Sequence, residues 1–442
     1  MATGTPGRGS AGPTIKFHLT YENLASIADV LNGEQASLKR VFSFGSTTSS
    51  NQLILGDNLR VMRSLMDDTS VAGKIRLVYI DPPYSTGFTF QSSHVGNAYD
   101  DSLSGAEYLE RLRQRLILLR ELMSPDASIY VHLDHHMVFA AKLIMDDLFG
   151  EKNFRNLITR VKCNPKNYTS HQFGNECDYL LFYTRGREHT WNHPVEPWPD
   201  DAGAREYPYV EPHTGRRFKK VPCHLPGIRY GETGEEWRGR RPPPGKHWVH
   251  SPNRLDELDR QGRIYWSPSG NPRRKLYLDE AEGRRLPNFW LSYKDTQNQN
   301  ARVTGFPTEK NNEMMKMIIN ASSEPEDLVF DAYSGSGTTL EAAGTLGRNW
   351  IGIDNSLPAT VITLRRLRLG TGRMGSYAQA DYLAARPHTE DWRLPGGLFV
   401  DSDDSICADS IGELLNEQCI TRPDEIEKVS QLQALKAALL EE

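Results

Sequence analysis

Four consecutive residues, Asp81, Pro82, Pro83 and Tyr84, combine groups that suit a flat heterocycle bearing an amino group. The carboxylate accepts hydrogen bonds, and the aromatic ring offers a face for stacking. The two prolines fix φ and have no N–H, so the carbonyl groups beside them can face a ligand instead of a neighbouring strand. Taken alone, the tetrapeptide is more typical of a proline-rich β-turn. Its interpretation therefore depends on the rest of the chain.

The position of this tetrapeptide favours a ligand site. The apolar run 75–80 directly before it predicts a buried strand. Open α/β sheets bind their ligands beyond the carboxyl ends of the strands. The polar stretch 85–105 that follows is long for a connection, and long loops at such a position often act as lids. Chemistry at this strand end is therefore the first expectation.

A second candidate site lies about 250 residues further along the chain. Residues 327–333 predict a strand, 334–339 a tight turn, 340–346 a helix and 350–353 a further strand. Strand, Gly-x-Gly turn, helix and a strand that ends in an acid form the plan of a Rossmann-type cofactor site. A Gly-x-Gly turn is weak evidence by itself, so the neighbouring residues must identify the cofactor.

The residues around this turn favour S-adenosylmethionine over NAD or ATP. Leu340 stands where a dinucleotide fingerprint needs a third glycine, and the turn lacks the lysine of a P-loop. Asp331, just before the turn, would repel a pyrophosphate but would favour the ammonium group of a methionine moiety. Asp354 is placed to accept hydrogen bonds from a ribose diol.

The region 185–300 differs from the α/β pattern on either side of it. Although the chain has a formal net charge of -5, residues 201–300 hold nineteen Lys and Arg against thirteen Asp and Glu. Basic residues interleaved with aromatic ones suit phosphate contact and base stacking; a loop-rich insert without DNA contacts is the alternative. The basic residues that we expect to contact DNA are Arg217, Lys219, Lys220, Arg240, Arg241, Arg273, Arg274 and Lys275.

Two groups of polar residues have competing interpretations. Asp57 follows a predicted strand and a glycine, and either caps the next helix or reaches a ligand at the sheet edge. Asp134, His135 and His136 end another predicted strand and suggest a metal site, but successive residues leaving a strand point to different sides. We therefore expect Asp134 to cap the following helix and predict no metal.

Composition excludes several classes of protein. With 442 residues the chain is long enough for two or three structural units. No stretch approaches the roughly 20 apolar residues of a membrane span, and residues 1–13 lack an apolar signal core. The five cysteines form no CxxC pair, which argues against a zinc knuckle and against a disulfide framework. We expect a cytoplasmic protein.

The two candidate sites together resemble those of the DNA amino-methyltransferases. That family joins a catalytic (D/N/S)PP(Y/F/W) motif to a cofactor loop close to DPFxGSGTT through a variable target-recognition region. Here the motif at 81–84 comes first, the basic insert next and the loop 331–339 last, which is the permuted order of the β group. Further matches lie at 56–58, 307–310 and 347–354.

The stretch from residue 81 to about residue 154 is particularly similar to the modification (Mod) subunits of type III restriction systems. Some positions depart from the family pattern. Ala332 and Tyr333 replace the usual Pro and Phe, and Asn311 stands where a proline often follows the lysine. These departures bear on cofactor affinity and leave the class unchanged.

The resemblance implies a Rossmann-like α/β fold of the S-adenosylmethionine-dependent methyltransferases, with a mostly parallel sheet, a permuted motif order and an irregular inserted target-recognition domain. It divides the chain into a flexible tail and short helix (1–40), a catalytic half (41–184), the DNA-binding insert (185–300), a cofactor-binding half (301–370) and an acidic C-terminal extension (371–442).

The resemblance also implies methyl transfer to an exocyclic amine of duplex DNA, after the target base has been flipped out of the helix. Asp81 and the Pro82 carbonyl would accept the two amine hydrogens, and Tyr84 would stack on the base. The Asp form of the motif and the Mod-like stretch favour adenine N6. Cytosine N4 presents the same geometry, and a catalytically silent DNA-binding subunit is the third alternative.

The implied cofactor is S-adenosyl-L-methionine, and the implied partner is double-stranded DNA, with no membrane association. A homodimer and a restriction or specificity subunit are further partners that the family suggests, and the expected location is the prokaryotic nucleoid. The residues expected to bind the cofactor are Asp57, Asp81, Pro307, Thr308, Lys310, Asp331, Tyr333, Gly335, Ser336, Gly337, Thr338, Thr339 and Asp354.

Overall fold

The computed structural model describes residues 19–21, 23–42, 51–83, 90–92, 96–99, 105–164, 171, 173–198, 200–295, 302–304, 309–373 and 397–401. The chain forms two compact units, which are considered separately. The smaller unit is His193–Leu286, and the larger unit contains the residues before and after it. Within the described residues, no helix is long and apolar enough to span a membrane.

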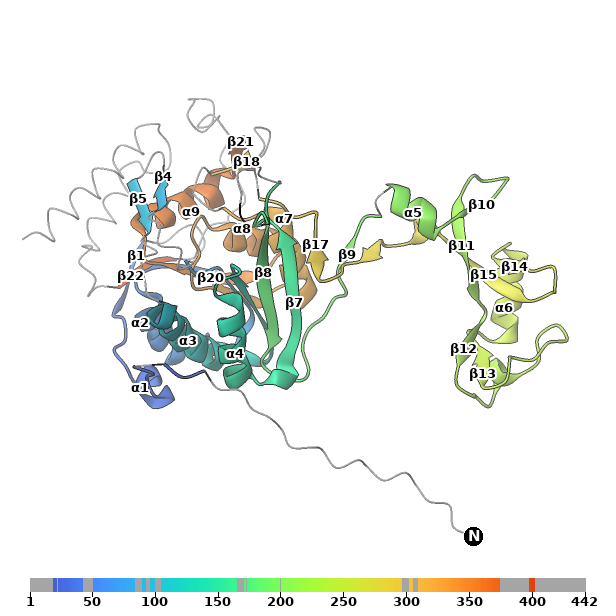
Figure 1. Cartoon of the computed structure of the whole chain (residues 1–442), viewed down its shortest axis with the longest axis horizontal. Coiled ribbons are helices and arrows are strands. Elements are labelled where there is room, and N and C mark those ends of the chain that lie inside the picture. Colours follow the sequence, from blue (N-terminus) through green and yellow to red (C-terminus); the bar gives the residue numbers. More distant parts are fainter. Residues whose placement is uncertain are drawn as a thin grey trace, which may run out of the picture. The chain divides into compact units, whose positions relative to one another are not determined.

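The larger unit is built around a ten-stranded sheet (Figure 1). In sheet order its strands are β1 (Leu38–Phe42), β22 (Gly397–Asp401), β2 (Gln52–Leu55), β20 (Asn349–Asp354), β19 (Leu328–Asp331), β3 (Ile75–Ile80), β6 (Met123–Leu133), β8 (Cys177–Thr184), β7 (Phe154–Val161) and β17 (Phe289–Trp290). The strands from β22 to β6 all pair in parallel, whereas β1, β8 and β7 add antiparallel pairings. The predicted mostly parallel α/β sheet is confirmed.

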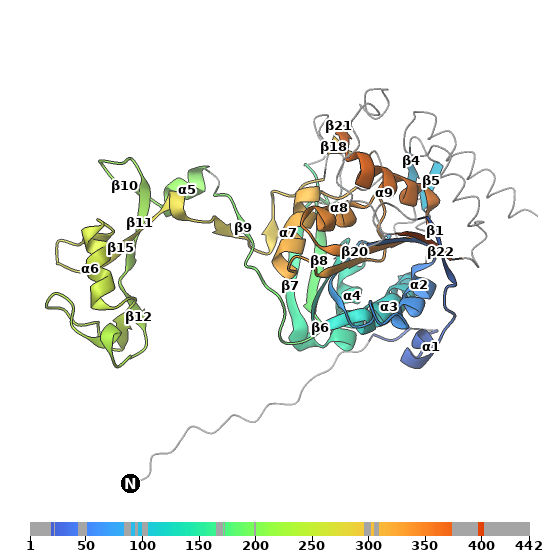
Figure 2. The same cartoon turned by 180° about the vertical axis from the view of Figure 1, so that it is seen from behind.

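Helices cover both faces of this sheet, as Figures 1 and 2 show from opposite sides. One layer contains α2 (Asn58–Met66), α3 (Gly105–Leu122) and α4 (Val138–Phe149), and the other contains α7 (Asn312–Ser322), α8 (Thr338–Thr345) and α9 (Leu357–Leu369). A strand covered on both faces buries both sets of alternating side chains, which explains the continuous apolar runs of β2 and β3. The short helix α1 (Ile27–Leu31) lies near the start of the chain.

The strand register brings distant sequence segments to one edge of the sheet. Phe330 in β19 pairs with Val78 in β3, and Asp331 pairs with Gly352 in β20. Leu55 in β2 pairs with Asp354 at the end of β20. The carboxyl ends of β2, β3, β19 and β20 therefore meet at the same edge, where ligands of open α/β sheets bind.

Local capping explains where several helices begin. The Asp57 carboxylate accepts a hydrogen bond from the Leu59 N–H (2.7 Å) at the start of α2, and the Asn311 side chain accepts one from Met314 N (3.1 Å) at the start of α7. Each side chain satisfies an N–H group that lacks a partner in the first helical turn. Asp57 is thus a helix cap, which was one of its two interpretations.

The predicted elements agree with the observed ones to within a few residues. The predicted strand 75–80 is β3, and the predicted helix 137–149 is α4. The edge strand β1 and its neighbour β22 were not predicted. The second of them falls in the segment assigned to an acidic extension, yet it pairs with both β1 and β2. The sequence pattern also predicts a helix at 425–440, a range that lies outside the described residues.

The smaller unit is more regular than the predicted irregular insert. Its four-stranded antiparallel sheet has the order β10 (Tyr209–Val210), β11 (Arg217–Pro222), β15 (Pro272–Tyr277) and β14 (Ile264–Trp266). Its other elements are β9 (Val195–Glu196), α5 (Asp200–Glu206), β12 (His224–Pro226), η2 (Glu232–Gly234), β13 (Lys246–Trp248), α6 (Pro252–Arg260), η3 (Leu278–Glu280) and β16 (Arg284–Arg285). A core of its own is formed by Cys223, Trp237, Trp248, Leu255 and Ile264.

The boundaries of the smaller unit differ from those predicted for the insert. The unit lies inside the predicted range 185–300. However, β17, near the end of that range, pairs with β7 in the large sheet. Short elements complete the larger unit: β4 (Phe90–Ser92), β5 (Gly96–Tyr99), η1 (Glu151–Asn153), β18 (Arg302–Val303) and β21 (Gly372–Arg373).

The burial of β22 leads to a prediction about stability. Leu398 is fully buried between β2 and β1, so Leu398→Ala should lower the free energy of unfolding by about 2–5 kcal/mol in urea titrations. Phe139, which is 66% exposed, provides the control, and Phe139→Ala should change it by about 0.5 kcal/mol or less. An unchanged unfolding midpoint for Leu398→Ala would contradict the placement of β22 in the sheet.

Candidate active site

Three aspartates lie at the carboxyl edge of the central strands. Asp81 directly follows β3, while Asp331 and Asp354 end β19 and β20. Because β19 is hydrogen-bonded to both β3 and β20, residues that are far apart in sequence come together there. This juxtaposition connects the two predicted sites, the proline motif and the glycine turn.

The glycine turn is held to the sheet edge by hydrogen bonds from its backbone. Gly335 N donates to Asp354 Oδ2 (2.8 Å), and Ser356 N donates to Asp354 Oδ1 (2.9 Å). Tyr333 N donates to Asp331 Oδ1 (3.0 Å), and Thr363 Oγ1 donates to the Gly335 carbonyl (2.9 Å). The two carboxylates thus shape the loop, and each retains further acceptor lone pairs for a ligand.

Gly337 occupies a position that only glycine fills without strain. Its φ is +75°, in the left-handed region, and a Cβ there would lie 2.7 Å from Thr363 Cγ2. Gly347 also has a positive φ, of +72°, but no atom lies within 4 Å of the position that its Cβ would take. The close approach at Gly337 allows α8 to begin directly behind the loop.

The environment of the loop carboxylates favours a cationic ligand. Burial raises the pKa of Asp331 to about 7, and the nearby negative charges of Asp81 and Asp354 act in the same direction. The Thr339 side chain and the Tyr333 N–H oppose this rise through hydrogen bonds. Burial also raises the pKa of Asp354, to about 6. A cation bound beside Asp331 would stabilise its ionised form, as the ammonium group of S-adenosylmethionine would.

Asp81 is part of a network of charged and polar side chains that extends into the interior of the sheet. Lys310 Nζ lies 2.6 Å from Asp81 Oδ2, and His132 Nδ1 lies 3.8 Å from Asp81 Oδ1. His132 is fully buried, and its Nε2 lies 2.9 Å from Asp178 Oδ2. Its Nδ1 lies 2.7 Å from the hydroxyl oxygen of Tyr79. Positive charge from Lys310 therefore meets the Asp81 carboxylate directly.

Asp178 and Arg160 complete this network of side chains in the interior of the sheet. Arg160 Nη1 lies 3.5 Å from Asp178 Oδ2, and the Arg160 guanidinium also binds Asp295 and the Tyr293 carbonyl. Although burial alone would raise the pKa of Asp178, the His132 imidazole and then the Arg160 guanidinium lower it. Buried charges of this kind require such partners.

Sequence reasoning missed His132, Asp178 and Arg160. Each is a charged or titratable residue at a buried position of a strand, in β6, β8 and β7 respectively. A polar residue inside a predicted buried strand was the available signal, because such a group must find a partner.

The other predicted catalytic and cofactor-binding residues differ in where they lie. Pro82 is buried and Pro83 half-buried beside Asp81, whereas Tyr84, Pro307 and Thr308 lie outside the described residues. Tyr333, Gly335, Ser336, Gly337, Thr338 and Thr339 form the loop between β19 and the start of α8. Asp57 lies after β2, at the same edge, with its side chain 50% exposed and 3.4 Å from Arg115 Nη2.

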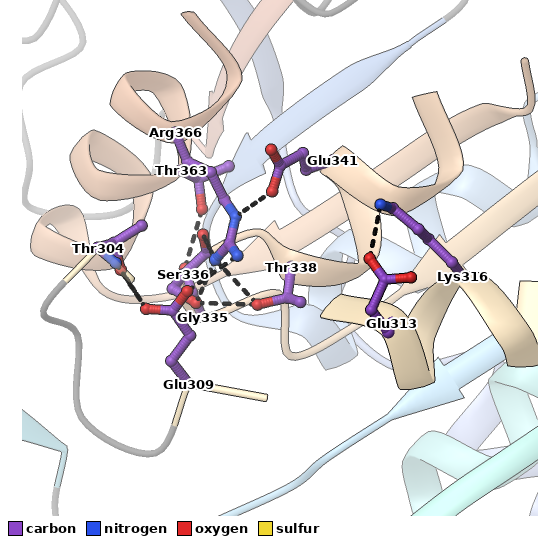
Figure 3. Close-up of polar contacts among 10 residues, drawn as sticks. All are labelled: Thr304, Glu309, Glu313, Lys316, Gly335, Ser336, Thr338, Glu341, Thr363 and Arg366. Atoms are coloured by element: carbon purple, nitrogen blue, oxygen red, sulfur yellow. Dashed lines mark hydrogen bonds and ion pairs between the residues drawn. The ribbon is translucent and has the colours of Figure 1, made fainter. Parts of the chain in front are cut away.

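The loop also has a buried arginine behind it (Figure 3). Arg366 in α9 donates hydrogen bonds to Ser336 and Thr338, and forms ion pairs with Glu341 and Glu309. No sequence motif indicated this residue, because it lies in a helix that follows the matched segments.

The residues Asp134, His135 and His136 converge more closely than predicted. Their potential ligand atoms all lie within 4.8 Å of one another, because the chain turns into α4 at this point. The Asp134 carboxylate accepts hydrogen bonds from His136 N (3.0 Å) and Met137 N (3.1 Å) in the turn before α4. The N-cap of α4 itself is Met137, without a side-chain hydrogen bond, so Asp134 stabilises the preceding turn and does not cap the helix as predicted. His135 Nδ1 lies 2.9 Å from the side-chain nitrogen of Asn175.

Several basic residues predicted to contact DNA have partners within the smaller unit. Lys219 Nζ lies 2.6 Å from Glu206, Lys275 Nζ lies 2.9 Å from Glu211, and the Lys220 ammonium lies over the rings of Tyr209 and Tyr265. An exposed ion pair still leaves a lysine able to exchange its partner for a phosphate, but some positive charge is already compensated.

The remaining predicted DNA contacts are arginines. Arg217 and Arg273 are exposed on β11 and β15, and Arg241 is 81% exposed with a weak contact to Glu236 (3.9 Å). Arg240 donates to Asn271 Oδ1 (3.1 Å), and the half-buried Arg274 lies 3.4 Å from His250 Nε2. Arginine at the surface is well suited to bidentate phosphate or base contacts.

Comparison with known proteins places these features in context. Residues 75–359 match the family model N6_N4_Mtase, described as DNA methylase. The type II methyltransferase M.EcaI of Enterobacter cloacae is 44% identical over 363 residues, which cover 81% of this chain and 79% of that protein. The StyLTI Mod subunit, from a type III restriction-modification enzyme of Salmonella typhimurium, is 26% identical over 67% of this chain, which spans only 50% of its length.

Among solved structures, the chain matches the M1.HpyAVI–SAM complex. The match has a TM-score of 0.39 and 16% sequence identity, and it covers 72% of this chain and 98% of that one.

The glycine positions lead to a prediction about the loop. Gly337→Ala should weaken binding of S-adenosylmethionine at least tenfold, because the new methyl group would displace Thr363 from the Gly335 carbonyl. Gly347→Ala incurs the same backbone cost without a clash and is the matched control. Isothermal titration calorimetry measures both, and equal affinities for the two variants would show that the close approach at Gly337 is unimportant.

Proposed function

This chain belongs to the DNA methylase family, and from that premise we propose that it transfers a methyl group to N6 of adenine in duplex DNA at a specific sequence. That it is a DNA methyltransferase of the restriction-modification type, with S-adenosylmethionine as cofactor, follows from its family and relatives. The choice of adenine and the roles of individual residues are the proposal.

The observation that carries the proposal is the position of Asp81 beside the glycine loop. Asp81 follows β3, whose sheet neighbour β19 runs directly into the loop through Asp331. An amine bound at Asp81 and a cofactor bound at the loop would therefore lie at adjacent strand ends. Such proximity is the main requirement for a direct transfer between two bound reactants.

The chain's own residues would hold and orient the amine. Bound S-adenosylmethionine supplies an activated methyl group. The Asp81 carboxylate and the Pro82 carbonyl would accept the two amine hydrogens, which would localise the nitrogen lone pair and leave it free to face the methyl group of a cofactor held by the glycine loop. Lys310 Nζ, 2.6 Å from Asp81 Oδ2, leaves the carboxylate further acceptor positions for the amine. Tyr84 would stack on the flipped base.

Adenine is proposed over cytosine because of the Asp form of the motif and the similarity to Mod subunits over the stretch 81–154. The N4 amine of cytosine offers the same two hydrogens, and the matched family name covers both N6 and N4. A catalytically silent DNA-binding subunit is the alternative of a different class. The intact set of Asp81, the glycine loop and the paired Lys310 argues against it.

The smaller unit would read the DNA sequence. Three of its exposed arginines, Arg217, Arg241 and Arg273, would contact phosphates or base edges, while Lys219 and Lys275 would have to leave carboxylate partners to do so. A homodimer and a restriction or specificity subunit are further proposals that rest on the family resemblance alone.

The decisive experiment is nucleoside mass spectrometry of duplex DNA after incubation with the protein and S-adenosylmethionine. We expect N6-methyladenine. N4-methylcytosine would select the second base, and unmodified DNA would select the silent subunit. Sequencing of the methylated product would also define the recognition site.

Removal of the Asp81 carboxylate tests the proposed mechanism. Asp81→Ala should lower the rate of methyl transfer by at least a thousandfold, because it removes the acceptor that orients the amine. The affinity for S-adenosylmethionine should change by about threefold or less, since the loop carboxylates remain. A labelled-methyl assay and calorimetry measure the two quantities, and near-normal transfer by Asp81→Ala would refute the assignment.

The raised pKa of Asp331 predicts a pH dependence of cofactor binding. Burial raises this pKa to about 7, so the carboxyl group is mainly neutral below pH 7 and ionised above it. The ammonium group of the cofactor prefers the ionised form, so affinity should rise by about tenfold between pH 5.5 and pH 7. Asp331→Asn should bind weakly and lack this step, whereas a flat profile for the unaltered protein would argue against contact between Asp331 and the ammonium group.

A further inference from the structure

The guanidinium of Arg366 joins three separate parts of the cofactor half (Figure 3). Its Nε donates to Glu341 Oε2 in α8 (2.7 Å). Its Nη1 donates to the Ser336 carbonyl (3.2 Å), Ser336 Oγ (3.1 Å) and Thr338 Oγ1 (2.9 Å) in the glycine loop. Its Nη2 lies 2.9 Å from Glu309 Oε1. Every nitrogen of the side chain thus has a partner in a different segment.

Arg366 and its two carboxylate partners are buried, which restricts how they can be arranged. The Arg366 side chain is 1% exposed, Glu309 is 7% exposed and Glu341 is 10% exposed. A buried guanidinium needs most of its donors satisfied, and its planar shape fixes the directions in which they point. Displacement of any one partner would therefore leave a buried charge or donor without compensation, so the three partners must keep their relative positions.

Glu309 connects Arg366 to the segment that contacts Asp81. Its second carboxylate oxygen, Oε2, accepts hydrogen bonds from Thr304 N (2.8 Å) and Thr304 Oγ1 (2.7 Å). The next residue is Lys310, whose Nζ lies 2.6 Å from Asp81 Oδ2. The residue after that, Asn311, caps α7 and donates to the Lys294 carbonyl (2.9 Å). Lys310 is therefore held between two anchored neighbours, and one of those anchors is Arg366.

We propose that Arg366 is a positioning residue that couples the glycine loop to the ion pair between Lys310 and Asp81, with Glu309 as the connecting group. The inference rests on the proposed function, in which the loop holds the cofactor and Asp81 holds the amine. A cofactor that restrains Ser336 and Thr338 would also restrain Arg366 and Glu309, and so would keep Lys310 against Asp81 before DNA enters.

A merely structural role for Arg366 makes different predictions. Loss of a buried ion pair lowers stability, but it need not affect cofactor binding and methyl transfer separately. Coupling through Glu309 predicts such a separation. Glu309 contacts Arg366 and Thr304, whereas the contacts of Arg366 with Ser336 and Thr338 do not pass through it.

Three variants of the full chain test the proposal. Glu309→Gln keeps a hydrogen-bonding side chain but removes the charge that faces Arg366. Arg366→Lys keeps the charge but replaces the fork of donors by a single ammonium. Glu313→Gln is the matched control, because Glu313 forms an exposed ion pair with Lys316 (2.8 Å) on the neighbouring helix α7 (Figure 3). The dissociation constant of S-adenosylmethionine is measured by calorimetry without DNA, and the rate by single-turnover methylation at saturating cofactor.

For Glu309→Gln we expect a rate about tenfold lower and a cofactor dissociation constant within about threefold of normal. Arg366→Lys should lower the rate and weaken cofactor binding by about tenfold each, because it affects both ends of the connection. Glu313→Gln should change neither. A normal rate for folded Glu309→Gln would overturn the proposal, and this variant suffices if Arg366→Lys fails to fold.

A double-mutant cycle separates this inference from the proposed function. Lys310→Met and Arg366→Lys, alone and combined, should show non-additive effects on the cofactor dissociation constant, with a coupling factor of about five or more. This measurement needs neither DNA nor methyl transfer, so a failure of the Asp81 assignment would leave it intact. If Lys310→Met and Arg366→Lys are additive, the two residues are not coupled and Arg366 only stabilises the fold.

Discussion

The parallel pairing of β3 with β19 is the constraint on which the rest of the site depends. It places Asp81 and Asp331 at neighbouring strand ends although they are 250 positions apart in the chain. The same pairing brings two negative charges together in a buried environment, which contributes to the raised pKa of Asp331. Other groups of the site stabilise these two neighbouring carboxylates.

The two carboxylates, Asp81 and Asp331, have different kinds of partners. Asp81 forms an ion pair with Lys310. Behind Asp81, basic side chains alternate with acidic ones in the order His132, Asp178, Arg160 and Asp295. Asp331 instead accepts hydrogen bonds from neutral groups of its own loop. The half that would hold the amine thus carries its own cation, whereas the other half is best completed by a cation on the ligand.

The sequence predicted the parts of the site that depend on local order along the chain. A buried strand followed by Asp81, and a strand followed by the glycine turn, are both patterns of adjacent residues, and both are present. Features that depend on long-range contacts were missed. The strand β22 has only five residues and is defined by its pairing with β1 and β2, and the role of Arg366 becomes visible only when α9 packs behind the loop. Tertiary contacts, which single-sequence patterns do not contain, decide such cases.

The smaller unit shows why composition was an imprecise guide to its charge. Eighteen Lys and Arg against fourteen Asp and Glu between His193 and Leu286 leave an excess of only four positive charges. Several basic side chains form ion pairs within the unit, such as Arg216 with Asp279 and Lys219 with Glu206. A unit with a core of only a few buried residues gains cohesion from such pairs and from cations over aromatic rings. Nine arginines of the unit, among them Arg217, Arg241 and Arg273, are nevertheless exposed, so its surface keeps guanidinium groups that are suited to directional contacts with phosphates or bases.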